Sequence, residues 1–144
     1  MRSMRAASVA FLLAASSVAG ADDWRQIVAA DLSHGTMVRI LLDVDSVKAR
    51  HGVLSAWVKV LYSAPQHLTG GKSFRSQYSL WGFNCTDEQG TTLAYTQYEG
   101  ADGTGDVLRT EQTPATQLQW TDVMPETAMQ LALQLACSVE TAKK

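Results

Sequence analysis

The sequence predicts an antiparallel α+β domain of about six strands with one C-terminal helix that a disulfide tethers to the sheet. Three observations predict this class. Segments rich in β-branched and aromatic residues recur between turn sequences over most of the chain, which is typical of antiparallel sheets. Helical periodicity is confined to the C-terminal part. One of the two cysteines lies in a strand-like segment and the other in the helical one.

Residues 1–21 have the layout of a secretory signal peptide rather than of an N-terminal structural helix. Arg2 and Arg5 precede an alanine-rich apolar stretch, and small residues stand directly before Asp22. The stretch is shorter than the ~20 strongly apolar residues of a membrane span, and no cysteine that could carry a lipid follows it. We therefore expect residues 22–144 to form one exported domain, periplasmic or secreted, without a membrane span or lipid anchor.

The charge of the chain argues against two classes of partner. The formal net charge is −2 and becomes −4 once Arg2 and Arg5 are removed with the signal peptide. A mildly acidic chain without a basic cluster is unsuited to nucleic acid or to an anionic membrane surface. We expect neither as a partner.

The expected strands alternate with turn sequences along the exported part. Strands are expected at 24–30, 36–47, 53–62, 72–85, 91–100 and 107–112, with a short extended piece at 117–123. The expected turns and loops between them are 33–35, 51–52, 64–71, 87–90 and 101–106. Alternation is clearest in 53–62, where apolar residues such as Ala56 and Val58 share one face and Trp57 and Lys59 share the other.

The C-terminal segment is the only one that reads as a helix. Thr127 and Gln130 fit a capping box, in which the hydroxyl and the amide satisfy free backbone N–H groups. Met129, Leu133 and Cys137 recur at i, i+4 and i+8, which places them along one apolar face.

Cys85 and Cys137 are expected to form a disulfide. Period two sets Cys85 on the same strand face as Trp81 and Phe83, and Cys137 lies on or beside the apolar face of the helix. Cysteines of exported domains favour disulfides, and this pair would tie the helix to the sheet. The alternatives are a free thiol or a redox pair, but there is no C-x-x-C motif. A metal site would need further ligands, and none cluster near these cysteines.

A series of motifs resembles the surface-adhesin protein E family of small exported bacterial proteins. The motifs are Trp24, "DVDSV" (43–47), "AWVKV" (56–60), "WGFNC" (81–85), Tyr98 with Gly100, Trp120 and "PETAMQLALQLAC" (125–137). Their order covers nearly the whole exported part. The sequence departs from the family where Asn84 replaces an acidic residue and where Glu126-Thr127 replaces glycine-serine at the helix entry.

The resemblance implies a fold and a function. The fold would be an antiparallel sheet with a C-terminal helix held by the disulfide, and the function would be binding rather than catalysis. The namesake adhesin is a surface lipoprotein and a dimer that binds host matrix and plasma proteins such as vitronectin and laminin. Such partners, and a homodimer, are therefore expectations for this chain.

Trp57 and Lys59 are the candidate binding or interface residues. If the aliphatic face of 53–62 is the core, Trp57 is exposed and could anchor a partner, or a second protomer covers it. We find no catalytic constellation and expect no metal and no cofactor, because the three histidines lie in or beside turns without ligand spacing. The alternative function is a periplasmic accessory module that binds a small apolar ligand or peptide between helix and sheet.

Overall fold

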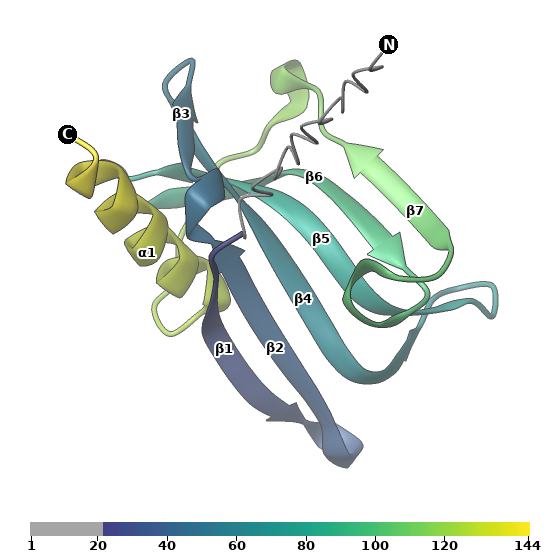
Figure 1. Ribbon diagram of the computed structural model, residues 1–144. Helices are drawn as coiled ribbons and strands as arrows, with labels where there is room; N and C mark the ends of the chain where they lie inside the picture. Colours follow the sequence, from purple (N-terminus) through teal and green to yellow (C-terminus); the bar gives the residue numbers. More distant parts are fainter. Residues whose placement is uncertain (1–21) are drawn as a thin grey trace, which may run out of the picture.

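The computed structural model describes residues 22–144 (Figure 1), and the predicted signal peptide at 1–21 lies outside the described residues. In the described part, eight strands form one antiparallel sheet that precedes helix α1 (Ala128–Ala142). The strands are β1 (Trp24–Leu32), β2 (Thr36–Asp43), β3 (Lys48–Arg50), β4 (Val53–His67), β5 (Ser73–Asn84), β6 (Gln89–Tyr98), β7 (Val107–Gln112) and β8 (Thr121–Asp122). The predicted fold class is confirmed.

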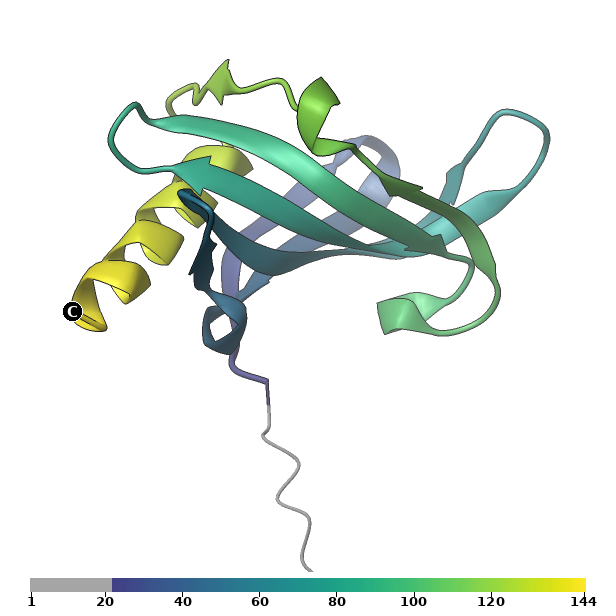
Figure 2. The same cartoon turned by 90° about the horizontal axis from the view of Figure 1, so that it is seen from above.

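The main sheet follows the order β1-β2-β4-β5-β6-β7, so most neighbours in space are also neighbours in the chain. The short strand β3 pairs with β4, and β8 pairs with β6. α1 contacts β1, β4 and β5. Both views show α1 at one end of the twisted sheet, away from the connection between β6 and β7 (Figures 1 and 2).

Strand β4 is longer than the sequence predicts. The predicted strand ends at residue 62 and a loop covers 64–71, whereas β4 continues to His67. Pro65 has no N–H group to donate to a strand ladder. It is tolerated because the pairing of β4 with β5 shifts register between Leu61 and Gln66.

The predicted strand at 36–47 is wrong beyond Asp43. The Asp43 carboxylate accepts a hydrogen bond from the Asp45 N–H at 3.0 Å, which turns the chain into the 3-10 helix η2 (Val44–Ser46). Such local bonds compete with a strand ladder. Strand β3 then forms before the predicted turn at His51 and Gly52, and the sequence did not indicate it separately.

The turn between β5 and β6 begins two residues earlier than predicted. The side-chain oxygen of Asn84 accepts hydrogen bonds from the N–H groups of Thr86 and Asp87, each at 3.1 Å. The chain therefore turns directly at the cysteine, and β6 already starts at Gln89.

The N-terminus of α1 is capped largely as predicted. The Thr127 hydroxyl accepts a hydrogen bond from the Gln130 N–H at 3.2 Å. The Gln130 side chain returns to the N–H of Glu126, at 2.7 Å, rather than to that of Thr127. Among residues 22–144, no helix has the length and apolar character that crossing a membrane requires.

The core lies between α1 and one face of the sheet. Its members are apolar side chains from β2, η2, the residue that follows η2, β4, β5 and α1, each at most 6% exposed: Leu42, Val44, Val47, Leu54, Ala56, Val58, Phe83, Ala132, Leu133 and Ala136. The alternating apolar face predicted for β4 is thus the face that packs against the helix.

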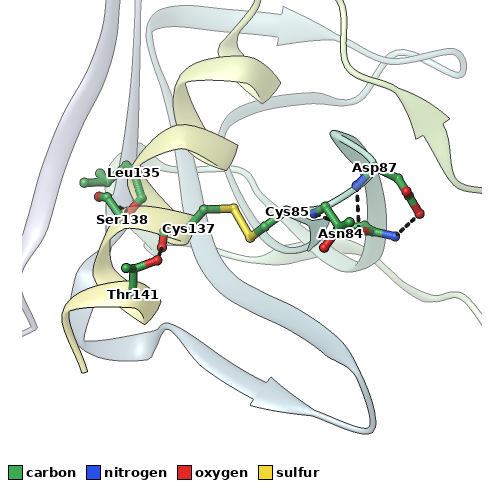
Figure 3. The surroundings of a disulfide bond; sticks show 8 residues. Asn84, Cys85, Asp87, Leu135, Cys137, Ser138 and Thr141 are labelled. Atoms are coloured by element: carbon green, nitrogen blue, oxygen red, sulfur yellow. Dashed lines mark hydrogen bonds between the residues drawn. A yellow bond between two sulfur atoms is a disulfide. The ribbon is translucent and has the colours of Figure 1, made fainter. Parts of the chain in front are cut away.

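The predicted disulfide joins Cys85 and Cys137, whose Cα atoms lie 5.9 Å apart (Figure 3). Cys85 directly follows β5, and Cys137 lies within α1 beside the buried Ala136. The bond therefore fixes the C-terminal half of the helix to the end of a central strand.

Candidate binding surface

Trp57 projects from the sheet face opposite α1. Its neighbours Ala56 and Val58 are fully buried in the core under the helix, so strand alternation directs the Trp57 side chain to the other face. Its cross-strand partner is Leu80, and Trp57 remains 42% exposed. An exposed tryptophan on a regular strand is a suitable anchor for a partner because it offers a large, stiff apolar surface.

The backbone of Trp57 is held where the neighbouring strand changes. β4 pairs with β3 up to Ser55 and with β2 from Val58 onward. In the gap, the Ser46 hydroxyl accepts a hydrogen bond from the Trp57 N–H at 2.8 Å and donates one to the Asp43 carbonyl at 2.7 Å. The aspartate-serine turn of η2 therefore fixes the position of the tryptophan.

An apolar groove of about 500 Å³ lies beside Trp57. Its floor includes Leu80 of β5 and Leu93 of β6, while Ala115 lines it from the connection after β7. Space for Leu93 exists because Gly82 has no side chain: a Cβ there would come within 3.4 Å of Leu93 and 3.0 Å of Thr91. The groove joins residues that are far apart in the sequence, from Ser46 to Ala115, so the sequence alone did not reveal it.

A basic rim borders the same groove. Lys48 and Arg50 are two apart on β3, and they pair with Ser55 and Val53 of β4, so they project to the Trp57 face. His51 lines the groove from the adjoining turn. We call this region, with Trp57, Leu80, Leu93, Lys48 and Arg50, the Trp57 groove.

Lys59 shares the face of Trp57, but its side chain is largely buried. Its ammonium lies 4.5 Å from the centre of the Trp24 ring and 2.9 Å from Oδ1 of Asp102, and its side chain is 10% exposed. Tyr78 also faces it, at 5.8 Å from ring centre to ammonium. Aromatic faces and a carboxylate offset part of the cost of removing this cation from water, so the Lys59 ammonium is accommodated within the fold.

The carboxylate of Asp102 reaches Lys59 from the connection between β6 and β7. This is the 3-10 turn η3 (Ala101–Gly103), in which Asp102 has the positive φ of 47°. The Ser76 hydroxyl donates to the Gly100 carbonyl at 2.8 Å and accepts from the Gly103 N–H at 2.9 Å. Gly103 has a φ of 74°, and a Cβ there would lie 3.0 Å from the Tyr78 ring. This turn therefore needs glycine for both its backbone and its packing.

Tyr78 and Asp102 perturb each other's pKa values. Burial, followed by the hydrogen bond to Asp102, raises the pKa of the Tyr78 hydroxyl. The bond from that hydroxyl, at 2.6 Å, and the nearby Lys59 ammonium lower the pKa of Asp102, although partial burial opposes this. Asp102 is thus held as a carboxylate.

Acid is expected to weaken the link between Lys59 and Asp102. The pKa of Asp102 in the folded state lies below the ordinary value of 3.8. At any pH above 3.8 the Asp102 carboxylate therefore makes its full contribution to the free energy of unfolding. The contribution is lost as the pH falls through the lower folded-state pKa. The loss should be at most about 1 kcal/mol, since the Asp102 side chain is 53% exposed.

Urea unfolding of the native protein and the Asp102→Asn variant, at about pH 7 and about pH 2.5, measures this effect. The stability difference between the two proteins should shrink in acid. Asp106→Asn, at an exposed aspartate just after the same turn, is the matched control. A difference that does not change with pH, or an equal response of the control, would contradict the expectation.

The histidines lie apart from one another. His34 and His51 occupy turns with positive φ, and His67 ends β4. Across the described residues, no group of three or more histidine, cysteine, aspartate or glutamate side chains is arranged to hold a metal ion.

The sequence and the structure were compared with those of known proteins, and the matches have the fold described above. The family model for surface-adhesin protein E matches residues 24–138. A comparison with curated protein sequences found no match. The structure is similar to crystal form II of Haemophilus influenzae protein E, with 17% identity and a TM-score of 0.52 over 69% of this chain and 80% of that chain. The selenomethionine form of the same protein gives 17% identity and a TM-score of 0.51, over 69% and 78%.

The match of the family model spans every strand of the described part and most of α1, including both cysteines and Trp57. At 17% identity, the likeness to Haemophilus influenzae protein E shows a shared fold. The chain belongs to the surface-adhesin protein E family.

Proposed function

We propose that the protein is an exported, non-enzymatic adhesin that binds host extracellular-matrix or plasma proteins through the Trp57 face of its sheet. The observation that carries the proposal is Trp57 itself, which is 42% exposed on the face that α1 leaves uncovered. Membership of the surface-adhesin protein E family supports binding as the activity. Vitronectin and laminin are the partners to test first.

The backbone around Trp57 is already fixed in the free protein, so a partner can bind without rearranging it. The Trp57 backbone is fixed by Ser46 and by pairing with Leu80, so little freedom is lost when a partner covers the side chain. Preorganised aromatic anchors of this kind contribute most of the energy at many protein interfaces. Tyr78 and Asp102, two of the groups with perturbed pKa values, bond to each other, and Asp102 also bonds to Lys59. This arrangement supports a structural use for them rather than a catalytic one.

The alternative, a ligand held between helix and sheet, has less support. Ala132, Leu133 and Ala136 of α1 are at most 6% exposed and pack on buried residues of the sheet such as Phe83. The protein's own side chains therefore fill the centre of that layer. The groove with the exposed tryptophan lies on the opposite face.

Replacing Trp57 by alanine is expected to weaken adhesion by about 10-fold or more, as for a central interface anchor. Surface plasmon resonance of protein recovered from the exported fraction, over immobilised vitronectin and laminin at physiological salt, measures the change. Met124→Ala is the matched control, because Met124 is an apolar side chain exposed elsewhere, at 70%. No affinity of the native protein for any matrix or plasma protein would overturn the proposal.

Sedimentation of the same samples tests whether a second copy covers Trp57. A native dimer that Trp57→Ala converts to a monomer would make this face a homodimer interface and contradict adhesion through it. A native protein whose oligomeric state is the same in the variant leaves the face available, as proposed. Fractionation of the native host into periplasm, membranes and medium tests the expected export.

A further inference from the structure

The cations of the Trp57 groove have no bonding partner among the described residues. Elsewhere, most lysines and arginines bond to a side chain or carbonyl of the protein: Arg25 to Asp23, Arg39 to Gln26, Lys59 to Asp102, Arg75 to the Ser63 carbonyl, Arg109 to Glu111 and Lys143 to the Val47 carbonyl. Neither Lys48 nor Arg50 has such a bond, and no acidic residue lines the groove. In a chain of net charge −2, this is a local concentration of positive charge.

The groove combines this charge with an apolar floor. Trp57, Leu80 and Leu93 provide the floor, and its volume of about 500 Å³ falls in the range of about 300–1,000 Å³ common for ligand clefts. Because Trp57 is still 42% exposed, the groove suits a side chain presented on the surface of another protein. A ligand for it should carry both apolar surface and negative charge.

The register of β3 against β4 sets the spacing that such a ligand needs. Arg50 pairs with Val53 and Lys48 pairs with Ser55, and Trp57 lies two residues further along β4 on the same face. Along the strand direction, Arg50, Lys48 and Trp57 therefore lie at steps of two residues, about 6.6 Å each, with the two cations on β3 and Trp57 on the adjacent strand β4. An extended peptide that runs along this row presents every second side chain to it.

We propose that the Trp57 groove binds an extended acidic segment of a partner protein, with acidic residues at i and i+2 against Arg50 and Lys48 and an apolar residue at i+4 against Trp57. This rests on the proposed adhesive function, because the segment belongs to the adhesion partner. The carboxylates form charge-assisted hydrogen bonds with the two cations, and the apolar side chain is buried on Trp57 and Leu80.

The test uses a fluorescein-labelled, capped seven-residue peptide with aspartate at positions 2 and 4, phenylalanine at position 6 and serine elsewhere, a pattern taken from the two-residue spacing of a strand. Three control peptides replace phenylalanine by serine, replace both aspartates by lysine, or place the aspartates side by side. Fluorescence anisotropy measures binding to the native protein. A shift of the NMR signal of the Trp57 indole N–H, which is assigned with the Trp57→Phe variant, shows that the peptide binds at the Trp57 groove. We expect the first peptide to bind best and to shift that signal.

Charge reversal of Lys48 and Arg50 together to glutamate should weaken binding of this peptide by about 10-fold or more, and Trp57→Ala should do the same. The matched control is Lys72→Glu, which changes an exposed lysine outside the groove and should alter affinity by less than about 2-fold. Circular dichroism and the oxidised mass verify that each variant is folded. Equal binding of the lysine or rearranged peptide, or an equal effect of Lys72→Glu, would overturn the inference.

Two further outcomes separate this inference from the proposed function. If the native protein binds vitronectin or laminin but the first peptide neither binds nor competes, the inference fails and adhesion stands. If the peptide binds as expected but no matrix or plasma protein does, adhesion fails and the recognition chemistry stands. Displacement of the Trp57 indole signal by laurate, without any effect of the peptide, would assign the groove to a free amphiphile and overturn the inference.

Discussion

Removal of the Cys85–Cys137 bond is expected to lower the free energy of unfolding by about 4 kcal/mol. The bond closes a loop with a sequence separation of 52 residues. In the chain-entropy treatment, a loop of this size restricts the unfolded chain by about that amount. The variant with both cysteines changed to alanine is the suitable one, because Cys85 is exposed and Cys137 is only partly buried, so the bond accounts for most of the expected loss.

Urea unfolding of the oxidised native protein and of this double variant measures the loss. The native protein reduced with dithiothreitol should unfold at the same urea concentration as the variant. Ser138→Ala, next to Cys137 on α1, should change stability by less than about 0.5 kcal/mol. If the double variant retained stability within about 1 kcal/mol of the native protein, the helix would not depend on its covalent link to the sheet.

Replacement of Phe83 by alanine should destabilise the protein by about 3–5 kcal/mol. Phe83 is 1% exposed and pairs with Leu54 and Gly90. It belongs to the same buried cluster as Leu133 of α1. The strand partner Gly90 has no side chain that could move into the cavity left by the Phe83 ring. Met129 already occupies the space beside Gly90, since its sulfur would lie 2.6 Å from a Cβ at that position. We therefore expect the cavity to stay largely unfilled.

Phe83→Leu keeps most of the volume and should cost less than about 1.5 kcal/mol. The comparison is made by urea unfolding under oxidising conditions, so that the disulfide is intact in every sample. Val107→Ala, at an apolar residue that is 56% exposed on β7, controls for the loss of apolar atoms at the surface. Equal losses for Phe83→Ala and Val107→Ala would contradict the core assigned to this end of the sheet.

The fold was predictable in segments where the spacing of apolar residues alone determines which side chains are buried. In β4, Ala56 and Val58 alternate with Trp57, and a helix covers the apolar side as expected. The cysteines were predictable because an exported domain with two of them allows one pairing. The cap at Thr127 follows from a local motif that needs no knowledge of the rest of the chain.

What the sequence did not reveal depends on contacts between distant segments or on competing local bonds. Strand β4 passes through Pro65 because a register shift accommodates it. Asp102 meets Lys59 from a turn that is 43 residues further along, so neither residue signals the other. The expectation that Lys59 shares the Trp57 face is correct, yet its place beneath Trp24 and beside Asp102 removes it from solvent.

The disulfide also determines how the protein would respond to force. In the proposed adhesive function the protein would be under tension, and tension applied between its ends passes from Cys85 directly to Cys137. The intervening 52 residue steps cannot be drawn out while the bond is intact, which shortens the fully extended chain by about 180 Å. Strands β6 to β8 lie inside this closed loop, whereas Trp57 and β3 lie outside it. A pulling force would thus disrupt the groove by separating β1 to β5 from the rest of the sheet. The segment that contains β6 to β8 would not be extended, because the disulfide joins its two ends.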